Sequence, residues 1–176
     1  MRGPAAPVLL ALLLATLSGC AEPPAVPDDA VMVRQPGLDG LELSAWVEQR
    51  NGFTYLRGVV HNTGDSVFET KEDCGYLWQS EVRGADGALH AYKPPSDHVC
   101  DWAYDFLRPG GHREFLHSWD GRFWNGTTAS EAEAWDAPAG DHTWTLRFLL
   151  RDGSDHDTMT PVPGRFLEAQ VPFRLA

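Results

Sequence analysis

The chain has 176 residues, and its 14 Lys and Arg against 25 Asp and Glu give a formal net charge of −11. This balance argues against binding to nucleic acid, because phosphate recognition depends on clustered Lys and Arg and the sequence has no such cluster. It also argues against electrostatic docking on anionic lipid, so attachment to a membrane would have to come from covalent acyl chains.

The first twenty residues have the pattern of an export signal that ends in cysteine. Arg2 supplies a short cationic region, Val8 to Leu17 are largely apolar, and Ser18-Gly19-Cys20 follow. This order resembles the lipobox of bacterial lipoproteins, in which the cysteine is lipidated and becomes the mature N-terminus. The resemblance implies a signal peptide at residues 1–19 and lipid attachment, by acyl chains such as palmitate, at Cys20.

The lipobox resemblance also implies a location, since such proteins are exported and lipid-anchored to a bacterial cell membrane. The apolar stretch is shorter than the about 20 residues that a membrane span needs, so it is not expected to remain as a transmembrane helix. The alternatives are an ordinary secretory signal that happens to end in cysteine and an uncleaved anchor.

The mature chain predicted from this cleavage is long enough for one domain. Removal of residues 1–19 leaves 157 residues (176 − 19), a length at which folding buries about 70% of the unfolded surface. Residues 20–39 contain four prolines and no helical or strand period, and we expect them to be a lipidated N-terminus and an extended tether. The domain would then comprise residues 40–176.

From Leu41 onward apolar and polar residues alternate, which is the pattern of half-buried β-strands. The clearest strand runs from 142 to 150, with Trp144, Leu146 and Phe148 on one face. We predict strands at 41–47, 53–61, 76–82, 88–92, 112–119, 142–150 and 167–173. A single helical turn within 128–135 is the only helical candidate.

Turn and edge residues organise these strands. Asn62–Asp65 and Gly84–Gly87 are rich in residues that tolerate turns, and the second contains an Asp-Gly pair typical of a hairpin. Pro172 cannot donate a backbone hydrogen bond, so the last strand is predicted at a sheet edge. Together these signals predict an all-β protein, an antiparallel β-sandwich of about seven to eight strands.

Three segments resemble, in their order, the BsuPI-type intracellular proteinase inhibitor domain. They are Cys74–Val82 before an Asp-Gly turn, Leu107–Gly110 followed by Ser118–Gly121, and Ala137–Asp141 before the strand with Trp144. The resemblance implies an immunoglobulin-like sandwich and, as an activity, proteinase inhibition. It assigns no inhibitory residue on this sequence.

Two cysteines remain once Cys20 is assigned to lipid. Cys74 and Cys100 form an even pair in an oxidising compartment, which predicts a disulfide between them. Such a bond would restrict the unfolded chain by roughly 3.5 kcal/mol. Free thiols are one alternative, and a zinc site that includes His98 is another, although zinc needs four convergent ligands and the usual spacings are absent.

Catalytic signatures are absent from the sequence. There is no G-x-S-x-G elbow, P-loop or G-x-G-x-x-G motif, and the histidines fall on different predicted strands and turns. We therefore expect no enzyme activity, no cofactor and no metal site. The carboxylates Asp152, Asp155 and Asp157 are expected in a solvated turn, with calcium binding as the alternative.

Tryptophan is the remaining functional signal. Trp46 alternates with the inward-facing residues of its strand, which predicts a position on the outer face. Trp124, with Arg122 and Phe123, lies in a loop bounded by glycines, and such aromatic and Arg residues often dominate protein interfaces. We expect Trp46, Arg122, Phe123 and Trp124 to be the partner-binding residues.

The functional prediction is therefore a monomeric, lipid-anchored module that binds a protein partner at the cell envelope. Two alternatives remain open. One is a passive structural or assembly accessory of the envelope, and the other is a carbohydrate-binding module that uses exposed tryptophan.

Overall fold

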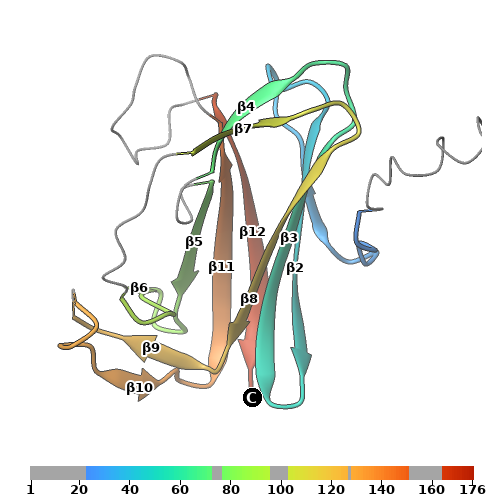
Figure 1. Cartoon of the computed structure of the whole chain (residues 1–176). Helices are drawn as coiled ribbons and strands as arrows, with labels where there is room; N and C mark the ends of the chain where they lie inside the picture. The colour runs from blue at the N-terminus through green and yellow to red at the C-terminus, as the bar shows by residue number, and fades with distance from the viewer. Residues whose placement is uncertain (1–22, 73–76, 96–102, 127, 151–163) are drawn as a thin grey trace, which may run out of the picture.

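The computed structural model describes residues 23–72, 77–95, 103–126, 128–150 and 164–176 (Figure 1). These residues form twelve β-strands and no helix, and every named strand pair is antiparallel. The all-β prediction is confirmed. The expected number of seven to eight strands is too low.

Two four-stranded sheets contain most of the strands. Sheet 1 has the order β1 (Val31–Val33), β2 (Leu41–Arg50), β3 (Phe53–Asn62) and β8 (His112–Trp119). Sheet 2 has the order β12 (Phe166–Leu175), β11 (Gly140–Leu149), β5 (Trp78–Arg83) and β6 (Leu89–His90). Two small ribbons complete the fold: β4 (Phe68–Glu72) with β7 (Ala103–Leu107), and β9 (Arg122–Trp124) with β10 (Ala134–Asp136).

The two sheets face each other across a shared apolar core. A Cβ on Gly58 of β3 would lie only 2.2 Å from Leu146 Cδ2 of β11, so glycine permits this close approach. The Phe115 ring of β8 lies 5.7 Å from the Trp144 ring and 5.9 Å from the Trp78 ring, between centroids. Trp144, Leu146 and Phe148 are all 0% exposed, as the alternation in this strand predicts.

The turn after β3 is held by a buried side chain. Asn62 Nδ2 donates to the carbonyls of Ser66 (2.7 Å) and Leu107 (3.1 Å), and its Oδ1 accepts from the Gly64 N–H (3.1 Å). These bonds satisfy a buried amide and join the end of β3 to β7. Pro172 lies on β12, an edge strand of sheet 2, so that prediction is confirmed.

The strands that the pattern did not predict are β1, β4, β7, β9 and β10, whereas β6 lies within the strand predicted at 88–92. β1, β9 and β10 have three residues each, too few for alternation to be visible, and β4 and β7 have five. β1 lies inside residues 20–39, where a tether is predicted, and pairs Val31 with Ala45 and Val33 with Leu43. Leu38 in the same stretch is 2% exposed. The domain therefore includes part of the predicted tether.

Candidate functional site

Several predicted sites fall outside the described residues. Cys20, the disulfide pair Cys74 and Cys100, and the carboxylates Asp152, Asp155 and Asp157 are all among them. Lipid attachment, the disulfide and the calcium alternative therefore stay predictions from the sequence.

Trp46 differs from its predicted exposure. Its strand register places it on the outer face of sheet 1, opposite Arg57, as the alternation predicts. However, the residue is only 8% exposed. It borders a cavity of about 570 Å³ together with Arg57, residues 25–27 and Asp29. The chain before β1 thus covers Trp46, which is not free to meet a partner directly.

Phe123 also differs from its predicted exposure. Gly121, with φ +79°, and the Asp120 carboxylate, which accepts from the Arg122 N–H (3.2 Å), turn the chain back into a strand rather than a loop. Alternate residues of that strand then point inward. Phe123 is 0% exposed, and its ring lies 4.5 Å from His90 and 5.4 Å from Trp119.

The β9–β10 ribbon places Arg122 and Trp124 on one face and Trp135 on the other. Residues opposite each other across an antiparallel pair share a face. Arg122 pairs with Asp136 and Trp124 with Ala134, whereas Phe123 pairs with Trp135 on the other face. Arg122 is exposed, Trp124 is partly buried, and Trp135 is 40% exposed.

Trp135 is an exposed aromatic residue that the sequence pattern does not predict. It lies in a three-residue strand where a helical turn is the sequence expectation, and no alternation marks it. Its ring centroid is 6.0 Å from that of Phe123 and 5.8 Å from that of His90. Trp135 therefore contacts the rings of Phe123 and His90 while 40% of the residue stays exposed.

Two hydrogen bonds join the ribbon to the rest of the fold. The Trp124 N–H donates to the Ala91 carbonyl (2.7 Å), just after β6, and the buried Trp119 indole of β8 donates to the Arg122 carbonyl (2.6 Å). The Ala137 N–H donates to the Gly121 carbonyl (2.7 Å) and closes the end of the ribbon itself. The ribbon is thus tied both to sheet 1 and to the chain that follows sheet 2's strand β6.

A cleft of about 540 Å³ lies beside the ribbon. Its lining is largely apolar and comes from two segments and Gly126: Ser80, Glu81, Leu89, His90, Ala91, Tyr92, Lys93, Pro94, Pro95 and Gly126. Leu89 is 51% exposed. Lys93 makes no ion pair with any residue that the structure describes, so its ammonium group remains available at the cleft.

Two titratable rings lie beneath this cleft. Tyr92 is 3% exposed, and burial raises the pKa of its hydroxyl to about 12, with a small opposing effect from the nearby Ser80 hydroxyl. The Tyr92 hydroxyl makes no hydrogen bond within the described part of the chain. The His117 ring lies 5.0 Å from the Tyr92 ring, and burial, aided by the Lys93 charge, lowers the pKa of His117.

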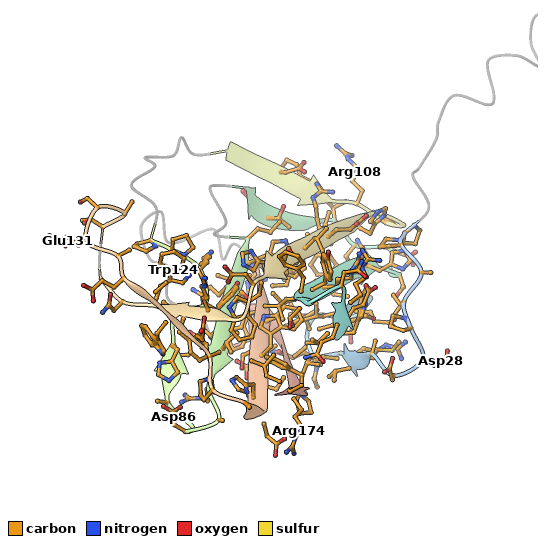
Figure 2. The ribbon with its side chains drawn as sticks, turned by 90° about the horizontal axis from the view of Figure 1, so that it is seen from below. Asp28, Asp86, Arg108, Trp124, Glu131 and Arg174 are labelled. Carbon is orange, nitrogen blue, oxygen red and sulfur yellow. The ribbon has the colours of Figure 1, made fainter. Side chains whose placement is uncertain are left out.

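Negative charge gathers around the ribbon and the adjoining hairpin. Five exposed carboxylates lie here, against the two guanidinium groups of Arg83 and Arg122: Asp86, Asp120, Glu131, Glu133 and Asp136. The Asp86 carboxylate accepts a hydrogen bond from the Ala88 N–H (2.9 Å) and contacts the His90 ring nitrogen (3.0 Å). Both contacts, the Ala88 bond more strongly, lower the pKa of the Asp86 carboxyl. Figure 2 places Asp86, Trp124 and Glu131 at the end of the molecule opposite Asp28.

In the described ranges no three His, Cys, Asp or Glu side chains are grouped so that they could hold a metal ion. The same ranges contain no helix long and apolar enough to cross a membrane. No family model matches the chain, and no curated protein is significantly similar to it.

Proposed function

We propose that this chain is a lipid-anchored protein-binding module of a bacterial cell envelope, attached through Cys20 and built on an immunoglobulin-like antiparallel sandwich. The lipobox-like sequence at Cys20 supports the attachment. The partly exposed tryptophans of the β9–β10 ribbon support the binding role. The observation that carries the proposal is Trp135, 40% exposed on a rigid ribbon.

The ribbon has the features of an interface that is organised before its partner arrives. Trp and Arg dominate the binding energy of many protein interfaces, and Arg122, Trp124 and Trp135 lie on one two-stranded ribbon. The bonds from Trp119 and Ala91 hold its backbone in place. Little conformational entropy would then be lost on binding.

Charge favours a partner with a basic surface. The five carboxylates around the ribbon exceed the two guanidinium groups by three charges (5 − 2). Complementary charge of this kind steers association and excludes acidic competitors. The neighbouring cleft, with Leu89 and Pro94 in its lining, adds apolar area for side chains of the same partner.

Proteinase inhibition is the specific activity that the BsuPI-type resemblance implies. In that form of the proposal the ribbon binds a serine protease at stoichiometric concentration without being digested. Carbohydrate binding is the second candidate. The 40% exposure of Trp135 favours it, because sugar rings stack on exposed indole rings. A passive accessory role would need no such site.

The test uses the mature chain with Cys20→Ser as a soluble bait for envelope extracts and for purified serine proteases. Trp135→Ala should reduce capture or inhibition at least tenfold, which corresponds to about 1.4 kcal/mol. Leu116→Ala is the matched control, because Leu116 is an apolar residue that is 60% exposed on the outer face of sheet 1 rather than on the ribbon. Equal losses for both variants would contradict the site. Retention on polysaccharide that Trp135→Ala abolishes would favour carbohydrate binding instead.

A further inference from the structure

The burial of Trp46 shows that the chain before β1 is not free. Residues 25–29 are here called the arm, and all of them except Asp28 border the same cavity as Trp46, Arg50 and Arg57 on the outer face of sheet 1. An indole on an outer face is expected to be largely exposed, yet Trp46 is 8% exposed. The arm therefore covers it.

The arm is continuous with the sheet. The Ala30 N–H donates to the Pro27 carbonyl (3.1 Å), and β1 follows at once with its ladder to β2. Prolines at 23, 24 and 27 fix the backbone φ of the approach and limit the conformations that the chain can adopt. From the arm onward the chain is thus tied to sheet 1.

The outer face of sheet 1 differs in charge from the ribbon end. Its arginines are paired with glutamates: Arg57 with Glu48 at 3.3 Å, Arg50 with Glu48 at 3.1 Å, and Arg34 with Glu42.

Apolar side chains are exposed between these pairs. Val26 is 39%, Met32 55% and Leu116 60% exposed. The strand registers place Met32 and Leu116 on the outer face with Trp46, and Val26 belongs to the arm. The paired charges and apolar side chains suit a zwitterionic headgroup surface, at which the exposed carboxylates Asp28 and Asp29 of the arm stay hydrated, whereas an anionic surface would repel both these carboxylates and the ribbon end.

We infer that the arm holds the outer face of sheet 1 against the lipid surface that carries Cys20, and so turns the β9–β10 ribbon away from the membrane. This inference rests on the proposed lipid attachment. Ala25 is only five residue steps from Cys20, a span of at most about 18 Å. A free tether from Cys20 to Asp39 would reach about 65 Å and would allow any orientation. The figures agree that the chain before β1 and the ribbon lie at opposite ends (Figures 1 and 2).

The orientation can be measured by NMR on the mature lipoprotein in lipid nanodiscs that contain a nitroxide headgroup lipid. Amide signals of β1 and β2 should lose intensity, while those of β9 and β10 should keep it. A Gly-Ser insertion of about ten residues after Glu22 should remove this difference, because it places a long flexible tether between Cys20 and the arm without altering the fold. Uniform loss across the domain, or stronger loss in the ribbon, would overturn the inference.

Two further measurements separate this inference from the proposed attachment. Failure of the wild-type chain to associate with nanodiscs would contradict lipidation at Cys20 rather than the orientation. In soluble Cys20→Ser protein, amide hydrogen exchange of the arm should accelerate with Trp46→Ala and stay unchanged with Trp135→Ala. An arm that exchanges equally fast with and without Trp46 is not docked, and that result would overturn the inference whatever the lipid state.

Discussion

The outer face of sheet 1 and the β9–β10 ribbon each contain an aromatic residue that the sequence predicts to be exposed, Trp46 and Phe123. Both residues are buried, but for different reasons. On sheet 1 the ten-residue strand β2 places Trp46 on the predicted face, but the arm covers it. In the ribbon a turn at Gly121 sends Phe123 into the core and leaves Trp135 open. The direction of a side chain and its exposure are thus separate properties.

Truncation of the buried ribbon residue should have the largest effect on stability. Phe123→Ala is expected to lower the free energy of unfolding by about 3–5 kcal/mol, because it removes a fully buried ring from among Trp119, His90 and His142. Urea denaturation followed by circular dichroism measures this change. Trp135→Ala, the matched variant on the same face of the ribbon, should cost less than about 1 kcal/mol. Comparable losses would show that Trp135 is also a core residue.

The covering of Trp46 predicts an intermediate effect. Trp46→Ala should lower the free energy of unfolding by about 3 kcal/mol, the low end of the range for truncating a buried tryptophan, because Trp46 is 8% exposed and borders a cavity. Because the arm is what buries Trp46, deletion of residues 23–29 should act through the same contacts. The two changes together should therefore cost less than the sum of the single changes. Additive losses would show that the arm and Trp46 do not stabilise each other.

Charge at the ribbon should affect association more than stability. Glu131→Lys with Glu133→Lys is expected to slow capture of a basic partner and to weaken its salt dependence, because both carboxylates are exposed. The free energy of unfolding should change by less than about 0.5 kcal/mol. Association rates at low and high ionic strength provide the measurement. Faster capture by the doubly substituted protein would point to an acidic partner.

The smallest effect concerns pH and the ring beneath the cleft. Burial lowers the pKa of His117 in the folded protein below its ordinary value of 6.5. At a pH between these two pKa values, the unfolded chain therefore protonates His117 more readily than the folded protein does. Stability contributed by neutral His117 is complete above pH 6.5 and is lost as the pH falls through the folded pKa. Thermal unfolding from pH 7.5 to 5 should show this decline, and His117→Asn should flatten it. An unchanged slope in the variant would assign the decline to other groups.

Local sequence pattern is enough to predict several parts of this fold. The alternation in 142–150 places Trp144, Leu146 and Phe148 in the core, because successive side chains of a strand point to opposite faces. The Asp-Gly sequence predicts the hairpin at 84–87, where Gly87 has φ +77°. Pro172 predicts an edge strand, since proline lacks the N–H that a central strand needs.

Which aromatic residues form the candidate site depends on long-range packing. Exposure depends on segments distant in sequence, and no pattern within β2 shows that residues 25–29 will cover Trp46. The strands β9 and β10 are three residues long, so their pairing follows from contacts with Ala91 and Trp119 rather than from their own periodicity. Local pattern sets the direction of a side chain, whereas packing by the rest of the chain sets whether solvent or a partner can reach it.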